Sequence, residues 1–295
     1  MIEPRGARRV GVVAKAGSVE AAGVARELIE WLARRGLEVF VEEGTAREAG
    51  AGGNGPLTEA ARCDLVVVLG GDGTLLSVAR KAAGGPPILG VNLGHLGFLT
   101  EVPRADFYPE LVEVLAGRYA VEPRSLLEVE QTKPSGERFG FRALNDVVLA
   151  KSALSRMIEL LLTVDGKLVA RYRADGLVVS TPTGSTAYNL SAGGPILHPL
   201  LPVSVLTPIC PHTLTLRPLV VPDSSVIEVT IETRADANRS RADRVYLTVD
   251  GQEGGELAFG DRVRITRASQ PAYLVRTGER GSIFEGLRNK LHWGE

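Results

Sequence analysis

The sequence predicts an α/β N-terminal domain with a parallel sheet, followed by a predominantly β C-terminal domain. Strand-like and helix-like segments alternate through the first 119 residues, a pattern typical of a parallel sheet with helices on both sides. The apolar pattern then changes to period two, which indicates strands with one buried face. At 295 residues the chain is long enough for two cores. We therefore expect an α/β domain at 1–119 and a mainly β domain at 120–274, with a tail at about 275–295 that could pack back on the first.

In the first domain, short apolar runs indicate strands and an amphipathic run indicates the first helix. Val24, Leu28 and Leu32 fall on one face of that helix, and Gly36 ends it. A glycine-rich stretch at 50–56 indicates a loop. The expected elements are a strand at 9–15, a helix at 19–35, strands at 37–43 and 64–69, a helix after residue 74, a strand at 87–93 and a helix at about 106–117.

In the second domain, strands dominate until a helix-like tail at 282–291. The turn Asp165-Gly166 between two alternating segments predicts a β-hairpin. The expected strands lie at 126–132, 139–150, 158–164, 167–172, 226–233, 244–249 and 262–267.

The most informative motif is the glycine turn at 70–74, which follows the apolar strand directly. Its glycines allow a ligand to approach the backbone closely, and a strand–turn–helix junction presents backbone N–H groups to an anion. We expect the turn to bind phosphate through Gly70, Gly71, Gly73 and Thr74. Taken alone, the turn could be a tight connection between two elements, but an acid inside a phosphate site favours catalysis over binding alone.

Four further clusters contain residues suited to chemistry. They are Gly94-His95-Leu96-Gly97-Phe98-Leu99, Asn145-Asp146, the stretch 173–191 and Asp250-Gly251-Gln252. Three of them could be ordinary loops, bulges or turns. The stretch 180–191 carries more hydroxyl groups than a turn requires, and these suit the base and ribose of a nucleotide.

Composition narrows the class of protein. A net charge of −1 and a pI near 6.5 argue against general nucleic-acid binding. No apolar run approaches the roughly 20 residues of a membrane span, and the N-terminus does not resemble a signal peptide, so we expect a cytoplasmic protein with no membrane partner. Cys63 and Cys210 fit reduced thiols, and His198 and His212 have no partners at metal-ligand spacing.

Taken in order, these motifs resemble those of bacterial NAD kinases. The resemblance rests on Gly-Gly-Asp-Gly-Thr, Gly-x-Leu-Gly-Phe-Leu, Asn-Asp, Asp-Gly-x-x-x-Ser-Thr-Pro-Thr-Gly-Ser-Thr-Ala-Tyr, Asp-Gly-Gln and the segment 210–219, and it spans roughly 64–270. The hydroxyl-rich motif is highly specific. The glycine turn alone is shared with lipid kinases and phosphofructokinases.

The resemblance implies transfer of the terminal phosphoryl group of ATP to the 2′-hydroxyl of the adenosine ribose of NAD, giving NADP. It implies that Asp72 accepts the hydroxyl proton, that Mg²⁺ or another divalent metal binds mainly through the phosphates, and that the protein is a homodimer or homotetramer with the NAD site near a subunit interface. The NAD contacts that it implies are Asp72, Gly73, Asn145, Asp146, Arg156, Arg173, Asp175, Thr183, Thr186, Ala187, Tyr188, Asn189, Leu190, Ser191 and Gln252.

Two positions depart from the family pattern. Asp146 replaces the commoner Glu, so the carboxylate is one methylene shorter. Ser77 stands where many relatives carry a basic residue, and Arg80 or Lys81 could substitute if the helix presents them to the site.

Two other functions are compatible with parts of the pattern. A lipid or sugar kinase would share the glycine turn, and a non-catalytic NAD(P) sensor would keep the hydroxyl-rich pocket without needing Asp72. The sequence leaves open whether the donor is ATP, another nucleoside triphosphate or polyphosphate, whether NADH is accepted, whether NADP inhibits, and whether the assembly is a dimer or a tetramer.

Overall fold

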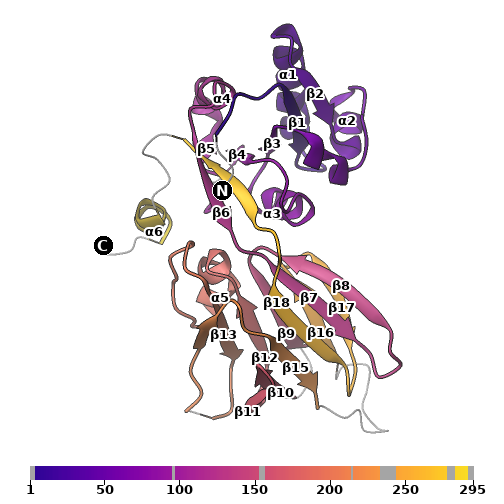
Figure 1. Cartoon of the computed structure of the whole chain (residues 1–295), viewed down its shortest axis with the longest axis vertical. Helices are drawn as coiled ribbons and strands as arrows, with labels where there is room; N and C mark the ends of the chain where they lie inside the picture. The colour runs from indigo at the N-terminus through magenta and orange to yellow at the C-terminus, as the bar shows by residue number, and fades with distance from the viewer. Residues whose placement is uncertain are drawn as a thin grey trace. The chain divides into compact units, whose positions relative to one another are not determined.

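The computed structural model describes residues 4–94, 97–152, 157–213, 215–232, 244–277 and 283–291 (Figure 1). The chain divides into two compact units, Met1–Arg124 with Gln270–Glu295, and Ser125–Ser269. The expected boundaries at 119/120 and 274/275 differ from these limits. They would place β6 (Ala120–Arg124) and the first residues of β19 (Ala272–Arg276) in the second domain. Those two strands pair with each other in the sheet of the first unit, a long-range contact that local sequence does not reveal.

The first unit is built on a mostly parallel sheet, as predicted. Its order is β2-β1-β3-β4-β19-β6, with β5 also paired to β4. The pairs β1–β2, β1–β3 and β3–β4 are parallel, whereas β19–β6 is antiparallel. The other strands are β1 (Arg9–Ala14), β2 (Glu38–Val41), β3 (Leu65–Leu69), β4 (Ile88–Asn92) and β5 (Val102–Pro103).

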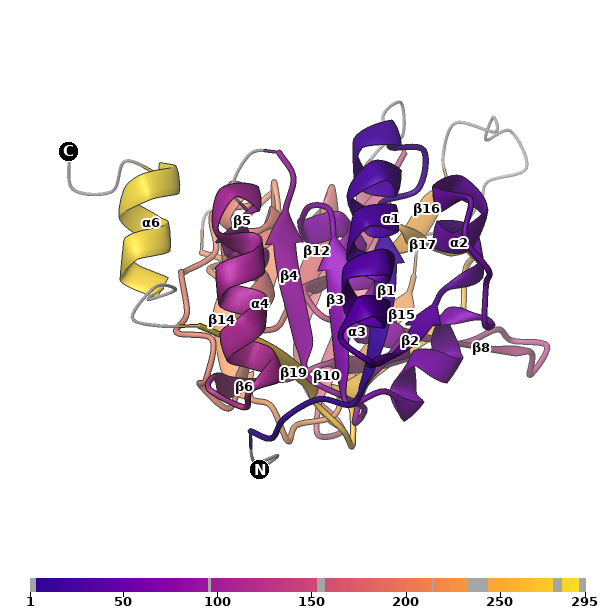
Figure 2. The same ribbon diagram turned by 90° about the horizontal axis from the view of Figure 1, so that it is seen from above.

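Helices cover both faces of this sheet. Leu28 of α1 and Leu111 of α4 share one core cluster with strand residues such as Leu89, so α1 and α4 lie on one face (Figure 2). Gly90 points to the other face, where a Cβ would lie 2.7 Å from Leu75 of α3. The helices of this unit are α1 (Val19–Arg34), α2 (Glu43–Ala49), η1 (Leu57–Arg62), α3 (Asp72–Lys81), η2 (Arg104–Asp106), α4 (Phe107–Leu115) and α6 (Ile283–Leu291). Within the described part of the chain, no helix is both long and apolar enough to span a membrane.

The second unit consists of two six-stranded antiparallel sheets around one core, which confirms the β prediction. Their orders are β11-β10-β15-β18-β7-β8 and β14-β13-β12-β9-β16-β17, and one cluster of buried residues draws on both sheets. The strands are β7 (Leu127–Thr132), β8 (Arg138–Ala143), β9 (Asp146–Lys151), β10 (Ile158–Val164), β11 (Lys167–Ala174), β12 (Gly176–Ser180), β13 (Val203–Ile209), β14 (Leu219–Pro222), β15 (Ile227–Ile231), β16 (Val245–Val249), β17 (Glu253–Leu257) and β18 (Arg262–Arg267).

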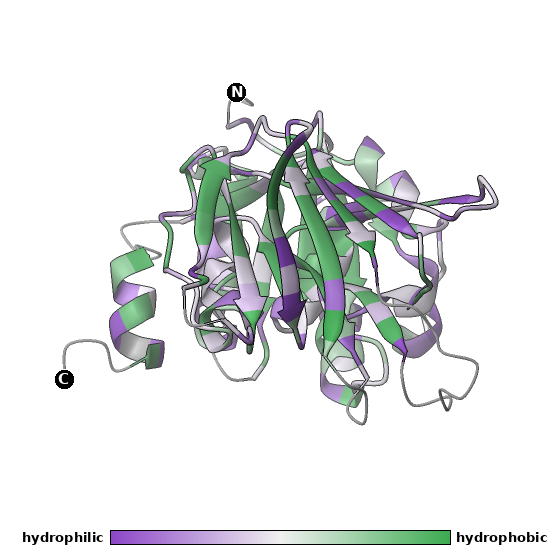
Figure 3. Cartoon of the chain, turned by 90° about the horizontal axis from the view of Figure 1, so that it is seen from below, coloured by the Kyte–Doolittle hydropathy of each residue, from purple (hydrophilic) through white to green (hydrophobic). Residues whose placement is uncertain are grey.

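The period-two pattern in this unit marks strands with one buried face. Buried and more exposed residues alternate along β7 and β16, and Figure 3 shows hydrophobic and hydrophilic bands along the strands. β10 and β11 form the predicted hairpin, and its turn residues Asp165 and Gly166 have φ of 51° and 73°. These left-handed conformations are what a two-residue Asp-Gly turn requires.

The expected strand at 139–150 is wrong, because the structure divides it into β8 and β9. The two strands belong to different sheets and are separated by Leu144 and Asn145. The Asp250 carboxylate accepts hydrogen bonds from the N–H groups of Leu144, Asn145 and Asp146 at 3.0, 2.7 and 3.1 Å. Asp250 is distant in sequence, and its carboxylate binds the backbone N–H groups at the point where the chain passes from one sheet to the other.

Candidate functional site

The glycine turn joins β3 directly to α3, whose first residue is Asp72. Gly71 is the N-cap, with extended φ and ψ of −103° and −173°. A Cβ at Gly70 would lie 2.7 Å from Thr74 Oγ1 and 3.1 Å from Lys15 Cβ, so a side chain does not fit there. The turn thus has the strand–turn–helix geometry of an anion site, and phosphate binding by Gly70, Gly71, Gly73 and Thr74 stays a prediction.

The Asp72 carboxylate accepts four hydrogen bonds from the loop 97–100. Phe98 N donates to Oδ2 at 2.7 Å, and Leu99 N, Thr100 N and Thr100 Oγ1 donate to Oδ1 at 3.0 Å each. A Cβ at Gly97 would overlap Oδ1 and lie 2.7 Å from Oδ2. The second glycine motif therefore lets its loop close around the acid of the first. Sequence analysis did not foresee this contact, and His95 and Leu96 of the same motif lie outside the described residues.

A pocket of about 660 Å³ lies beside the glycine turn in the first unit. It is at the carboxyl ends of β1 and β3, and the helices that follow these strands cover opposite faces of the sheet. Open α/β sheets bind their ligands at such a switch point. The lining residues are Val13, Ala14, Lys15, Ala16, Glu42, Glu43, Gly44, Thr45, Pro56, Leu57, Gly71, Gly73, Thr74, Ser77, Val78 and Lys81.

Both basic and acidic side chains line this pocket. Lys15 and Lys81 line it, whereas Arg80 is 5% exposed and does not. Glu42 caps α2 by accepting a hydrogen bond from Thr45 N at 2.8 Å. Burial opposes ionisation of Glu42, but the N–H groups of Thr45 and Gly44 together with Lys81 outweigh it and keep its pKa below the usual value. α3 therefore presents Lys81, and not Arg80, on the side of Ser77.

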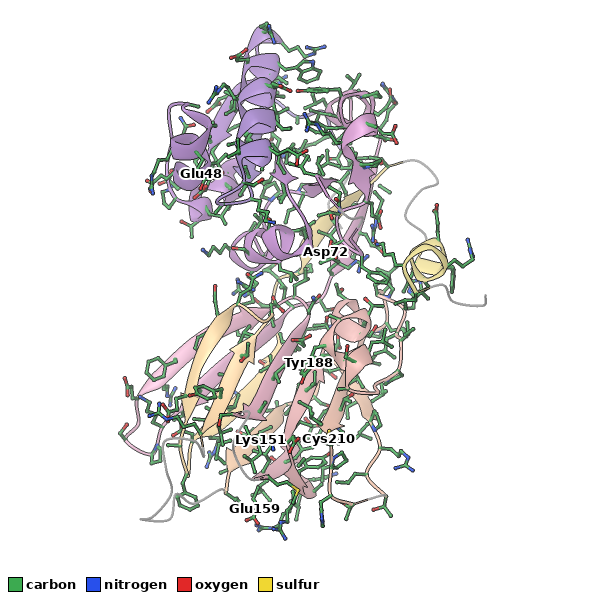
Figure 4. All side chains as sticks on the ribbon, turned by 180° about the vertical axis from the view of Figure 1, so that it is seen from behind. Glu48, Asp72, Lys151, Glu159, Tyr188 and Cys210 are labelled. Atoms are coloured by element: carbon green, nitrogen blue, oxygen red, sulfur yellow. The ribbon has the colours of Figure 1, made fainter. Side chains whose placement is uncertain are left out.

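A second pocket of about 360 Å³ lies within the second unit and gathers residues from three sequence motifs. Four of the predicted residues line it, namely Asn145, Asp146, Ala187 and Tyr188. Tyr188 begins the short helix α5 (Tyr188–Ser191), which follows η3 (Thr183–Thr186), and it is labelled in Figure 4. The other lining residues are Val148, Thr248, Asp250 and Gly251.

Asn145 and Asp146 are held between two neighbouring segments. Asp250, with a φ of 49°, accepts from their N–H groups and donates its own N–H to Asp146 O at 2.9 Å. From the other side, Thr181 N donates to Asn145 O at 2.9 Å. A Cβ at Gly184 would overlap the Asn145 carbonyl, so the hydroxyl-rich segment needs glycine at this position.

Asp146 is a buried acid, 4% exposed, that lines the pocket beside a second carboxylate. Burial, and after it the Asp250 charge, raise its pKa to about 7, although the Tyr188 N–H opposes the rise. At neutral pH the side chain therefore exists in both forms. Its ionised form can accept hydrogen bonds from two hydroxyl groups of a ribose.

Comparisons with known proteins agree with this arrangement. Residues 10–119 match the ATP-NAD kinase N-terminal domain family, and residues 144–277 match the ATP-NAD kinase C-terminal domain family. The chain is 46% identical over 290 residues to an NAD kinase of Geotalea daltonii, covering 98% of this chain and 99% of that one. It is 47% identical over 291 residues to an NAD kinase of Geobacter sulfurreducens, with the same coverage. The chain belongs to the NAD kinase family.

Two solved structures of the family resemble the whole chain. Yeast NADH kinase complexed with NADH has a TM-score of 0.85 and 31% identity, and the match covers 99% of this chain and 89% of that one. An NAD kinase from Archaeoglobus fulgidus in complex with ATP has a TM-score of 0.73 and 30% identity, and the match covers 96% and 98%. The predicted family and fold class are confirmed.

Several residues predicted from the NAD kinase resemblance do not line the pocket. Asn189 is fully buried, where its Nδ2 donates to Ser185 O and Pro195 O at 3.1 Å and its Oδ1 accepts from Thr207 at 2.7 Å. Its carboxamide thus supports the segment from inside, and the predicted contact of Asn189 with NAD stays a prediction. Thr183, Thr186, Leu190, Ser191 and Gln252 are near lining residues in sequence but are not among them.

Arg173 and Asp175 lie at the other end of the strands from Asp146. Asp175 pairs with Lys151 at 3.0 Å, and Arg173 pairs with Glu159 at 3.3 Å. Lys151 and Asp146 are the two ends of β9, about 17 Å apart at 3.3 Å per residue. Lys151, Glu159 and Tyr188 are labelled in Figure 4. The pocket of one chain therefore does not bring these residues together, and Arg156 lies outside the described residues.

Sequence reasoning missed Asp250, the acid that organises the pocket. The sequence points to the cluster Asp250-Gly251-Gln252, but the family resemblance implies a role for Gln252 alone. An acid before glycine at the end of a strand was the available signal, because such a residue can adopt positive φ. Its partners are more than 100 positions away, so the sequence did not show which N–H groups it binds.

Proposed function

We propose that this chain transfers the terminal phosphoryl group of ATP to the 2′-hydroxyl of the adenosine ribose of NAD, giving NADP. The observation that carries the proposal is the pocket of the second unit, where Asn145, Asp146, Ala187, Tyr188 and Asp250 come from three separate family motifs. Membership of the NAD kinase family supports the activity, and relatives in complex with NADH and with ATP support the two classes of substrate.

In this proposal the pocket binds the adenosine part of NAD. The Asp146 carboxylate accepts hydrogen bonds from ribose hydroxyls, and the Asn145 carboxamide can both donate and accept. Tyr188 is 45% exposed, and its ring offers an apolar face to the nucleoside. Because Asp250 fixes the backbone of both polar residues, their side chains are oriented before the ligand arrives.

Asp72 is the residue that we propose accepts the hydroxyl proton. Phosphoryl transfer passes through a loose transition state, so the protein acts mainly by alignment and by charge stabilisation. Asp72 Oδ1 already accepts three hydrogen bonds, whereas Oδ2 accepts one from Phe98. A carboxylate offers about four lone-pair positions over its two oxygens, so Oδ2 is the atom with room for a substrate hydroxyl.

The pocket beside the glycine turn is the proposed site of the donor. The N-terminus of α3 favours phosphate, and Lys15 and Lys81 supply positive charge that Ser77 does not. Val13, Pro56 and Leu57 give the remainder of this pocket apolar walls that suit a base. Replacing Lys81 by Met therefore separates donor from acceptor binding, since it should raise the KM for ATP and leave that for NAD unchanged.

A divalent metal such as Mg²⁺ fits the residues of this pocket when the phosphates supply most of its ligands. In the described part of the chain, no three of His, Cys, Asp and Glu gather to hold a metal by themselves. Thr74 and Glu43 offer oxygen atoms along the pocket wall that could complete the coordination. When bound, the metal neutralises the charge of the transferred phosphoryl group.

We further propose a homodimer or homotetramer in which Arg173 and Asp175 serve the NAD site of a neighbouring copy. Asp175 directly precedes β12 at the end of that strand remote from Asp146, and Arg173 lies in the last residues of β11, which supports this division of roles. Light scattering of the purified protein gives the subunit number. A double change of Arg173 and Asp175 to Ala should raise the KM for NAD without altering the KM for ATP.

The decisive assay follows NADP formation with a dehydrogenase that accepts only NADP. The purified chain is supplied with NAD or NADH, with Mg²⁺, and with ATP, another nucleoside triphosphate or polyphosphate. NADP formed from NAD and ATP supports the proposal. Calorimetric binding of NAD without NADP formation would make the protein a sensor, and phosphorylation of a lipid or sugar instead would make it a different kinase.

A further inference from the structure

The C-terminal helix α6 places a lysine on the loop that holds Asp72. Lys290 Nζ lies 4.2 Å from the centroid of the Phe98 ring. Gly286, four residues earlier on the same helix face, packs on that ring, since a Cβ there would lie 3.7 Å from two ring carbons. Leu287 beside it is 2% exposed. Figure 3 shows apolar and polar segments along α6, as expected for a helix with one packed face.

Phe98 connects this helix to the acid of the glycine turn. Its own N–H donates to Asp72 Oδ2, and the next two residues donate to Oδ1. A shift of the Phe98 ring would move the first of these donors. Two direct contacts therefore connect the C-terminal helix to the carboxylate, one between Lys290 and Phe98 and one between Phe98 and Asp72.

Two charged residues act on the Lys290 ammonium in opposite directions. Burial, reinforced by Arg276 of β19, lowers the pKa of Lys290 to about 8, although Asp72 acts in the opposite direction. Arg276 itself forms ion pairs with Glu101 and Glu122, so these two acids already have a cation. On α6, Glu285 and Arg288 are the other charged residues with described side chains, and neither contributes to the shift. Asp72 is thus the acid whose field supports the ammonium.

We propose that Lys290 is a positioning residue for Asp72, acting through Phe98. The inference rests on the proposed function, since it assigns Lys290 to the step in which Asp72 accepts a proton. The ammonium holds the aromatic ring, the ring fixes the loop 97–100, and the loop amides orient the carboxylate. Loss of the charge loosens this chain of contacts without removing any group that touches a substrate.

The kinetic test compares Lys290→Met, which keeps a packed side chain without charge, with Lys290→Arg, which keeps the charge. Because Lys290→Met loses a desolvated cation–π contact, we expect its kcat to fall by about 3- to 30-fold. Both KM values should stay within about twofold of wild type. Lys290→Arg should restore kcat. Lys133→Met is the matched control, because Lys133 Nζ lies 4.7 Å from the Phe139 ring in the second unit.

The pH profile and hydrogen exchange distinguish positioning from a structural role. Turnover of the wild type should fall as the pH rises through about 8, and this limb should move to higher pH in Lys290→Arg. Exchange of the Phe98, Leu99 and Thr100 amides should accelerate in Lys290→Met, but not in Lys290→Arg or Lys133→Met, while exchange within α6 stays unchanged.

Hydrogen exchange is measured without substrates, so it tests the role of Lys290 independently of catalysis. If the wild type forms no NADP, that result refutes the proposed function, and the exchange data still decide whether Lys290 holds the loop. The inference is overturned if Lys290→Met matches the wild type in exchange and turnover. It is also overturned if Lys290→Arg is as slow as Lys290→Met, or if all of α6 loses protection, because the helix and not the charge would then hold the loop.

Discussion

Replacing Asp146 by Asn should stabilise the protein at alkaline pH. The pKa of Asp146 rises from the ordinary 3.8 to about 7 in the folded state, first through burial and then through Asp250. Between these two values the folded state keeps a proton that the unfolded state has released. The free energy of unfolding therefore falls as the pH rises through this window. At about 1.4 kcal/mol per pKa unit, the ionised carboxylate destabilises the folded state by up to about 4 kcal/mol above pH 7.

The assay is urea unfolding of wild type and Asp146→Asn from pH 4 to pH 9. Like the protonated acid, the amide is uncharged and keeps an oxygen for the Tyr188 N–H, so the difference should be near zero at pH 4. It should grow to at most about 4 kcal/mol in favour of the variant by pH 8. Asp165→Asn in the exposed hairpin turn is the control, because its oxygen still accepts from Val226 N. A difference that stays flat from pH 4 to 9, or that favours the wild type at high pH, would refute the reasoning.

Four other substitutions test the candidate site. Asp72→Asn should lower turnover by about 100-fold or more, and near-normal NADP formation would exclude the catalytic role. The free energy of unfolding should fall by about 1.5–3 kcal/mol, because the amide NH₂ group cannot accept from at least one of the four donors that the carboxylate binds. Gly97→Ala places a Cβ in the Asp72 carboxylate, so kcat should fall comparably, and an unchanged kcat would contradict the close packing. Gly184→Ala pushes against the Asn145 carbonyl and should raise the KM for NAD and lower the melting temperature; normal values of both would show that the segment can relax. Lys81→Met should raise the KM for ATP at least about threefold, as loss of one exposed phosphate contact predicts, and a change confined to NAD would contradict the donor assignment.

The glycine turn could be predicted from sequence because every determinant is local. β3 is buried throughout, so its apolar run has no polar interruption, and the glycines and Asp72 follow without a gap. The structure places the strand at Leu65–Leu69 and the helix at Asp72–Lys81, within a few residues of expectation. The same holds for the hairpin at Asp165-Gly166, where two adjacent residues determine the turn.

Features that depend on distant partners could not be predicted. α2 (Glu43–Ala49) buries Thr45, Ala46 and Ala49, which are too small to give an apolar period. Its N-cap is Glu42, a residue that sequence patterns do not favour at this position. The sequence does not place β6 and β19 in the sheet of the first unit, because their pairing joins residues about 150 positions apart. The division between β8 and β9 likewise depends on Asp250, which lies more than 100 positions away.

Asp72 and Asp250 show why the motifs of this chain occur together. Each acid belongs to one motif and accepts hydrogen bonds from the backbone of another, Asp72 from Phe98–Thr100 and Asp250 from Leu144–Asp146. A carboxylate that accepts three amide N–H groups fixes the loop that supplies them, so neither motif of a pair can keep its geometry without the other. The residues that we expect to touch NAD or the transferred phosphoryl group are thus held by contacts between motifs. A single motif such as the glycine turn consequently indicates only a broad class of kinase, whereas the set of motifs specifies the site.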